Sequence, residues 1–350
     1  MFALVGVRKR GEDIRRFILE NVKEHPADIA TFTAERFSVS RQAVNKHLKK
    51  LINEEVLVTE GTTRDRRYRL NLFEREFDYA LDGNLAEDVI WRKDVSPLFE
   101  ELPENVRHIL QYGFTEMFNN AIEHSSGTAV KVYIEKTAMT SLIHLIDNGE
   151  GIFKKIQREF NLEDERHALL ELAKGKLTTD PAHHTGEGIF FSSRMFDRYE
   201  IVSGNTIFAH SGNYGDWLFE NPRMPIDIGI GTSVLMEINN NASITAKEVF
   251  DSFASGDEDY GFTKTIVPVR LAQYEREKLI SRSQAKRVLA RVENFKTVVF
   301  DFRGVDMIGQ AFADEIFRVF SQEHPDLAIF HVNANTEIER MIRRAIGQKI

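Results

Sequence analysis

The chain has 350 residues, a hydrophobic fraction of 42% and no cysteine. This composition indicates two or three domains with apolar cores, and it excludes disulfides and thiolate metal sites. No apolar run reaches the length of a membrane span, so we expect a cytoplasmic protein with no membrane partner. The net charge of −8 argues against nucleic-acid binding by the chain as a whole, but residues 1–70 carry 15 Lys and Arg against 10 Asp and Glu.

The basic N-terminal region predicts three helices followed by a hairpin. Apolar residues recur at helical spacing in residues 12–23, 29–37 and 41–54, and Ser40 suits the N-cap of the third helix. Two short strands follow, on either side of a glycine turn with a basic tip. This pattern resembles a winged helix-turn-helix domain, in which residues 41–54 would be the recognition helix.

That resemblance implies DNA binding through two groups of side chains. Gln and Asn can bond adenine in a bidentate way, Arg can do so with guanine, and basic side chains on a wing contact phosphates or the minor groove. The expected DNA-binding residues are Arg41, Gln42, Asn45 and Lys46 on the helix, with Arg64, Arg66 and Arg67 on the hairpin. A winged helix used only for protein contacts or dimerisation is the alternative.

Residues 71–103 connect this region to the next. They mix acidic residues with Phe73, Phe77, Tyr79 and Trp91 and are too apolar for a disordered linker. We expect a helical connector that packs on the following domain. Pro103 then predicts the start of a long helix.

Four motifs follow in residues 104–240. They are Glu116 with Asn120, four apart on an amphipathic helix; Asp147-Asn148-Gly149-Glu150-Gly151 after a strand; Thr185-Gly186-Glu187-Gly188; and Gly231-Thr232 before another strand. In this order they resemble the GHKL nucleotide-binding fold of DNA gyrase, MutL, histidine kinases and anti-sigma-factor kinases. The resemblance implies an α/β sandwich, with a mixed sheet under helices, that binds ATP and Mg²⁺. A fold that has lost ATP binding is the alternative.

The resemblance gives the first motif the chemical role. Asn120 would offer a neutral oxygen to Mg²⁺, a cation that takes oxygen ligands and bridges phosphates. Glu116 would orient or deprotonate the group that attacks the γ-phosphate. His124 has a counterpart in the anti-sigma-factor kinases, although a structural cap is the simpler interpretation of this residue.

The second and fourth motifs would recognise the base. In the family the residue at Asp147 accepts a hydrogen bond from the adenine amino group, and a threonine at Thr232 lies beside the base. Gly149 and Gly151 would let the backbone approach the base without a Cβ clash.

The third motif would bind the phosphates. Residues 152–184 are long and polar and predict a mobile lid, with Thr185, Gly186 and Gly188 as its hinge and a helix N-terminus facing the phosphates. The family usually has Gly-x-Gly-Leu-Gly-Leu, whereas this chain has Gly-Glu-Gly-Ile-Phe-Phe, which leaves phosphate affinity and lid motion open. The adjacent His183 and His184 are not expected to form a metal site.

Residues 260–350 alternate strands with helices, which predicts a small, partly parallel α/β layer. The run 298–305 and the helix after it resemble STAS domains, and most closely the STAS-like domain of unknown function that ends bacterial ATP-binding proteins. In the anti-sigma system a GHKL kinase phosphorylates a STAS protein on Ser or Thr at the start of this helix. Residues 306–312 have no hydroxyl here, so we expect a domain that docks a protein partner or couples a signal, or one that forms a homodimer.

The predicted fold class is α+β multidomain: a winged helix-turn-helix in residues 1–70, a helical connector in 71–103, a GHKL domain in 104–240 and a STAS-like domain in 260–350. The favoured function is a transcription or signalling regulator in which ATP binding, with or without slow hydrolysis, repositions the DNA-binding and STAS-like modules. A Ser/Thr protein kinase that acts on a partner protein is the enzyme alternative. An ATP-dependent stress or defence switch, whose winged helix binds protein, is the third.

Overall fold

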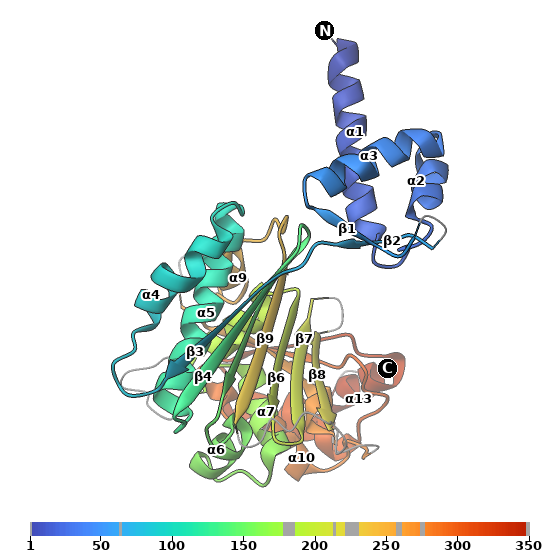
Figure 1. The fold of residues 1–350 in the computed structure, drawn as a ribbon. Helices are drawn as coiled ribbons and strands as arrows, with labels where there is room; N and C mark the ends of the chain where they lie inside the picture. Colours follow the sequence, from blue (N-terminus) through green and yellow to red (C-terminus); the bar gives the residue numbers. More distant parts are fainter. Residues whose placement is uncertain are drawn as a thin grey trace. The chain divides into compact units, whose positions relative to one another are not determined.

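The structure is a computed structural model that describes residues 2–62, 65–177, 186–212, 215–220, 231–256, 261–273 and 277–347, without the side chains of residues 2–9, 215 and 217–220. It is a mixed α+β protein with two-, three- and seven-stranded sheets (Figure 1). The chain divides into two compact units: Met1–Glu76 with Tyr133–Ile143 and Ile238–Ala242, and Phe77–Val132 with His144–Glu237 and Ser243–Ile350. No helix in the described ranges is long and apolar enough to cross a membrane.

Residues 2–70 form three helices and a hairpin. These are α1 (Phe2–Asn21), α2 (Ile29–Phe37), α3 (Arg41–Asn53), β1 (Leu57–Glu60) and β2 (Arg67–Leu70). The helices enclose a core that includes Ile18, Val22, Val44 and Leu48, each with an exposed fraction of 1% or less. Ser40 caps α3 as predicted, because its Oγ accepts a hydrogen bond from the Ala43 amide at 3.2 Å.

The seven-stranded sheet has the order β3-β4-β5-β9-β6-β7-β8. Its strands are β3 (Phe73–Ala80), β4 (Ala129–Lys136), β5 (Thr140–Asp147), β6 (Arg198–Ser203), β7 (Thr206–Ser211), β8 (Gly215–Glu220) and β9 (Thr232–Asn239). Strand β6 pairs antiparallel with both β9 and β7, and β7 pairs antiparallel with β8.

The expectation of a wholly helical connector was wrong, because residues 73–80 form the edge strand β3. Residues 76–79 alternate charged with aromatic residues at period 2, which is the strand period and not the helical one. Tyr79 packs edge-on against Phe118 with ring centroids 5.5 Å apart. The later connector is helical, with α4 (Glu87–Ile90) continuing into a π-helical turn (Trp91–Val95) and a 3-10 turn (Ser96–Phe99).

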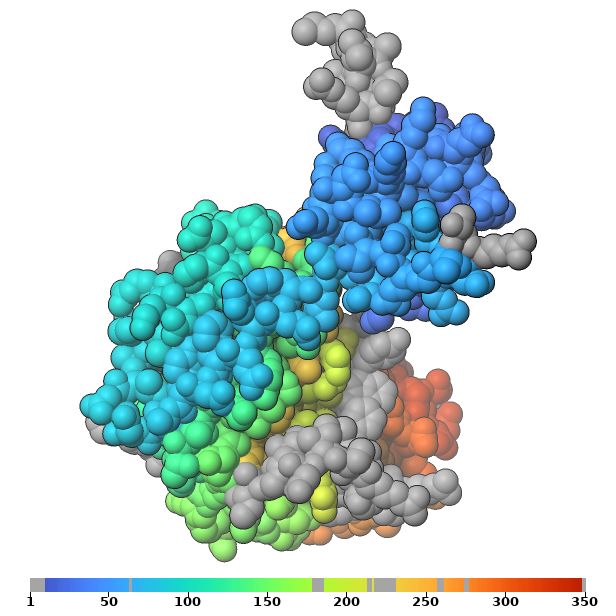
Figure 2. Space-filling view, viewed as in Figure 1, coloured from blue at the N-terminus to red at the C-terminus, as the bar shows by residue number. Residues whose placement is uncertain are grey.

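Helices cover one face of this sheet (Figure 1). They include α5 (Glu104–His124), α6 (Ile152–Glu159), α7 (Glu165–Lys174), α8 (Gly188–Met195) and α9 (Ala246–Ser252). Helix α8 packs on β6 and β7, and α5 packs on α8. Burial alternates along β6, where Tyr199, Ile201 and Ser203 are buried and their neighbours are not, and Figure 2 shows strand residues, in green and yellow, at the surface turned to the viewer.

The expected irregular lid in residues 152–184 is mostly helical, which corrects that prediction. Helix α6 buries Phe153 and Ile156, and Asp164 caps the N-terminus of α7, because its Oδ1 accepts a hydrogen bond from the His167 amide at 2.9 Å. Helix α6 is amphipathic and most of α7 is buried. The polar residues of the segment had suggested an irregular loop, because composition was considered without the helical period. The segment 178–185, with His183, His184 and Thr185, lies outside the described residues.

The C-terminal sheet is parallel throughout, in the order β10-β11-β12. Its strands are β10 (Lys264–Pro268), β11 (Thr297–Asp301) and β12 (Ala328–Val332). The helices of this region are α10 (Arg282–Leu289), α11 (Gln310–Asp314), α12 (Ser321–Glu323) and α13 (Thr336–Ala345). A π-helical turn (Glu315–Phe320) joins α11 to α12, and 3-10 turns lie at Val269–Ala272 and Val292–Asn294. The predicted α/β alternation is therefore confirmed. Phe300, Phe312 and Ile338 are fully buried in this layer.

Candidate functional site

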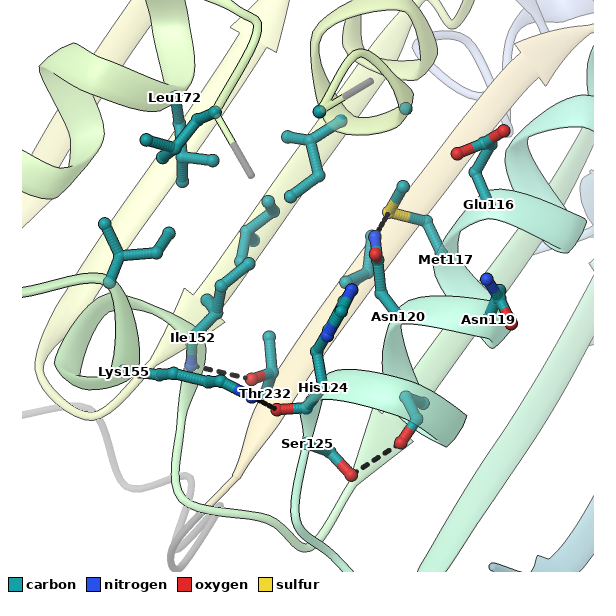
Figure 3. A pocket seen from close by; sticks show the side chains of 18 of the residues that line it. Glu116, Met117, Asn119, Asn120, His124, Ser125, Ile152, Lys155, Leu172 and Thr232 are labelled. Atoms are coloured by element: carbon teal, nitrogen blue, oxygen red, sulfur yellow. Dashed lines mark hydrogen bonds between the residues drawn. The ribbon is translucent and has the colours of Figure 1, made fainter. Parts of the chain in front are cut away.

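A cavity of about 420 Å³ lies beside α5, a volume typical of small-molecule sites. Its walls come from α5, the β5–α6 turn, α6, α7, α8 and β9 (Figure 3). The predicted residues that line it are Glu116, Asn120, Asp147, Gly151, Gly186, Gly188 and Thr232. Residues from all four motifs therefore meet at one cavity. Gly149 is not among the lining residues, and Thr185 lies outside the described part of the chain.

Helix α5 directs Asn120 and His124 into the cavity (Figure 3). Its opposite face is buried by Phe114 and Phe118, which fixes the rotation of the helix. The amide nitrogen of Asn120 donates to the sulfur of Met117 at 3.8 Å, and the other polar atom of this side chain is the amide oxygen. This is the oxygen that a hard cation would use.

Glu116, on α5, lies against Gly188 at the start of α8. A Cβ built on Gly188 would overlap the Glu116 carboxylate, so a larger residue there would have to displace that carboxylate. Burial, followed by the negative charges of Glu116 and Glu187, raises the pKa of the Tyr112 phenol. Two carboxylates therefore lie close to the N-terminus of α8, where the helix dipole favours negative charge.

Asp147 and Thr232 form the other end of the cavity. Asp147 Oδ1 accepts backbone hydrogen bonds from Gly149 at 2.8 Å and from Thr232 at 3.3 Å. Thr232 Oγ1 accepts from the Ile152 amide at 3.0 Å. Burial raises the pKa of Asp147, and these backbone donors oppose the rise. The same two hydrogen bonds orient the carboxylate.

The two glycines of the second motif have different surroundings. Gly149 packs against the carbonyl oxygen of Ser125, where a Cβ would overlap it. Gly151 has φ +90° and lines the cavity. The first glycine therefore permits a close backbone contact away from the cavity, and the second permits the turn into α6.

Sequence reasoning missed several lining residues, among them Lys155, Phe160, Leu172 and Leu177. Lys155 Nζ donates to the main-chain carbonyl of His124 at 2.7 Å and so caps the C-terminus of α5. The three apolar residues belong to no motif, and only packing brings them to the cavity.

The cavity wall is rich in carboxylates, with Glu87, Glu116, Asp147 and Glu187 against Lys155. A polyphosphate would meet like charge there unless a divalent cation neutralised it. Across the described ranges, no group of three or more His, Cys, Asp or Glu side chains forms a metal cage. A cation at this site would therefore need ligand oxygens beside Asn120.

The expected DNA-binding residues lie on a separate surface, in the first unit. Arg41, Gln42, Asn45 and Lys46 are exposed on α3, opposite its buried Val44, Leu48 and Leu51. Arg66 and Arg67 are also exposed, and Arg64 lies outside the described residues.

Residues 284–338 match the family model of a STAS-like domain of unknown function (DUF4325). The C-terminal region is a STAS-like domain. The matched span of this STAS-like domain includes β11 and β12 of the parallel sheet and α10 and α11 beside it. No curated protein matches the chain.

Proposed function

We propose that the chain is a Mg-ATP-binding regulator with a GHKL-type nucleotide domain. The observation that carries the proposal is the convergence of four sequence motifs, from Glu116 to Thr232, on one cavity of about 420 Å³. The seven-stranded sheet with helices on one face supports this proposal, because the GHKL resemblance implies a sheet under helices. A buried carboxylate with a raised pKa, here Asp147, in a cavity with converging polar groups is also typical of a functional site.

The end of the cavity at Asp147 suits adenine. The exocyclic amino group of adenine is a hydrogen-bond donor, and an oriented carboxylate is its natural acceptor. Asp147 is oriented by the Gly149 and Thr232 amides, and Thr232 itself lines the cavity. A base with a carbonyl at the same position would be repelled by the carboxylate.

The end at α8 suits the phosphates. Gly186 and Gly188 expose backbone at the start of a helix, where anions are favoured. Mg²⁺, when bound with ATP, would supply charge neutralisation for the phosphates, and Asn120 would hold it through the amide oxygen. Glu116 would accept a proton from an attacking hydroxyl or water.

The N-terminal unit would supply the output of this regulator as a winged helix-turn-helix. Three helices, an antiparallel hairpin and an exposed polar face on α3 support this assignment. We infer that it binds DNA through that face and through the hairpin. The STAS-like domain would receive a protein partner or a signal.

The test is binding of Mg-ATP and release of phosphate by the full chain, beside Asn120→Ala and Glu116→Ala. Gln111→Ala, at an exposed position of α5 outside the cavity, is the matched control. We expect Asn120→Ala to lose binding and Glu116→Ala to keep binding but lose turnover by roughly a hundredfold or more. No binding of Mg-ATP to the unmodified chain would overturn the proposal. Radiolabel transfer to another protein instead of to water would favour the kinase alternative.

A further inference from the structure

Helix α7, in the wall of the cavity, is fixed to the STAS-like domain by a buried charge. The Lys174 side chain is 1% exposed and pairs with Glu171 at 2.7 Å. Its Nζ also donates to the main-chain carbonyls of Arg287 at 3.2 Å and Ala290 at 2.7 Å. These carbonyls end α10, so an ammonium from the cavity wall caps a helix of the STAS-like domain.

Arg291 makes the reciprocal contact from the STAS-like domain. Its backbone is left-handed, with φ +64°, a conformation uncommon for any residue but glycine. Its guanidinium donates to the carbonyl of Lys176, lies 3.7 Å from Glu171 and sits over the Phe160 ring at 5.1 Å from the centroid. One side chain thus contacts three separate pieces of the neighbouring module.

Two of these contacts lead directly to the cavity. Phe160 lines it, and Lys176 precedes Leu177, which lines it as well. The Leu177 amide donates to the carbonyl of Gly186 at 3.2 Å, and a Cβ on Gly186 would lie 2.5 Å from the Leu177 backbone. The peptide that Arg291 holds is therefore in contact with the glycine turn that begins α8.

The same peptide has a second anchor in the STAS-like domain. Lys176 Nζ donates to the carbonyl of Asn294 at 2.9 Å and lies 4.7 Å from the centre of the Phe295 ring. Residues 291–295 therefore hold both the main chain and the side chain of Lys176. A shift of this segment would move the approach to Gly186 with it, because packed contacts of this kind transmit displacement.

We propose that Arg291 is a positioning residue by which the STAS-like domain holds the nucleotide cavity in its binding shape. This inference rests on the proposed nucleotide function and adds that the STAS-like domain controls the nucleotide affinity. A partner that displaces residues 291–295 would change nucleotide affinity, and the nucleotide would change the affinity for that partner by the same factor.

The experiment measures Mg-ATP affinity by calorimetric titration of the full chain and of Arg291→Ala, Arg291→Lys and Arg287→Ala. Arg287 is the matched control, since its side chain pairs with Glu163 at 3.2 Å across the same two modules, and neither residue lines the cavity. We expect Arg291→Ala to weaken binding roughly tenfold, within the usual range of coupling between sites, and Arg287→Ala to change it less than about twofold.

The Arg291→Lys variant distinguishes the effect of the positive charge on affinity from that of the planar guanidinium. Lysine keeps the positive charge near Glu171 but lacks the planar group that stacks on Phe160, so an affinity between those of the unmodified chain and Arg291→Ala is expected. If Arg291→Ala fails to fold, Arg291→Gly replaces it, because glycine adopts φ +64° without strain. Urea unfolding of each variant reports stability beside affinity.

The outcomes are distinguishable. Mg-ATP binding by the unmodified chain with equal affinities for the Arg291 and Arg287 variants would overturn the positioning role and leave the proposed function intact. Absence of Mg-ATP binding by the unmodified chain would overturn the proposed function and this inference together. Weaker Mg-ATP binding by the Arg291 variants alone, at a stability equal to that of Arg287→Ala, would support the positioning role of Arg291.

Discussion

The carboxylate of Glu116 lies against the α-carbon of Gly188, where any side chain would overlap it. The two residues come from different motifs and different helices, α5 and α8. Their contact joins the candidate base to the turn that would face the phosphates. Because this contact is close, a substitution at Gly188 should change the position of the Glu116 carboxylate.

We predict that Gly188→Ala displaces Glu116 and lowers ATP turnover by at least roughly tenfold, with only a small loss of stability, because the group displaced is the end of a flexible side chain. Urea unfolding and phosphate release are the measurements. Gly212→Ala is the control, because a Cβ there meets nothing within 4 Å. In a Glu116→Ala background the stability cost of Gly188→Ala should largely vanish; an unchanged cost would show that the overlap is with another group.

Nucleotide affinity should fall in mild acid through Asp147. Burial raises the pKa of this carboxyl above its ordinary value of 3.8, so protonation, which removes the charged acceptor, begins at a higher pH than for an exposed Asp. The raised pKa also means that the folded state binds this proton more tightly, so acid does not destabilise the fold through Asp147. Titrations of Mg-ATP from pH 7 to pH 4 test this.

Asp147→Asn is the reference in those titrations, because it retains only the pH dependence of the nucleotide and of other groups. We expect it to bind more weakly at pH 7 and to lose the component of the pH dependence assigned to Asp147. Identical pH profiles for both proteins would exclude Asp147 as the titrating group.

Lys174→Met should destabilise the second unit by about 3–5 kcal/mol, the cost of leaving one member of a buried pair without its partner. Although burial pushes the pKa of Glu171 up, Lys174, His167 and Arg291 hold it below the ordinary 4.5. Glu171 therefore contributes full stability above pH 4.5, and this is lost as the pH falls through its folded pKa. Urea unfolding at pH 7 and at pH 4 gives both quantities.

The control for that series is Lys247→Ala, which breaks the exposed pair of Lys247 and Asp251 and should cost less than about 0.5 kcal/mol. Joint replacement of Glu171 and Lys174 by Leu and Met should recover much of the loss. A loss no larger for Lys174→Met than for Lys247→Ala would refute the assigned role of the buried pair.

Alanine at Arg41, Gln42, Asn45 and Lys46 together should abolish DNA binding without unfolding the first unit, since all four side chains are exposed on α3. Arg41→Ala alone should weaken binding and, if Arg41 contacts a phosphate, reduce the salt dependence of the affinity by about one unit of slope. Gel-shift titrations at several salt concentrations provide the measurement. Arg16→Ala, at an exposed position on α1 paired with Asp13, should leave binding unchanged; equal loss there would indicate a nonspecific charge effect.

Local patterns in the sequence predicted most elements near their observed bounds. Helix α5 coincides with the predicted segment from Glu104 to His124, because its apolar residues repeat at 3.6 and a proline precedes it. The alternation in the C-terminal region likewise predicted the α/β layer. Two secondary-structure predictions were wrong. Residues 73–80 were predicted as helix because their composition was considered without their period of two, and polar residues on α6 and α7 were interpreted as a loop.

Local patterns were enough to identify the four motifs and the helix face that carries Asn120. Tertiary structure alone decided that Phe160, Leu177 and Arg291 belong to the same neighbourhood, since no local repeat relates residues more than a hundred positions apart. It also separated Gly149, packed under the Ser125 carbonyl, from Gly151 in the cavity wall. The physical reason is that periodicity encodes which face of an element is buried, whereas the shape of a cavity depends on which buried faces meet.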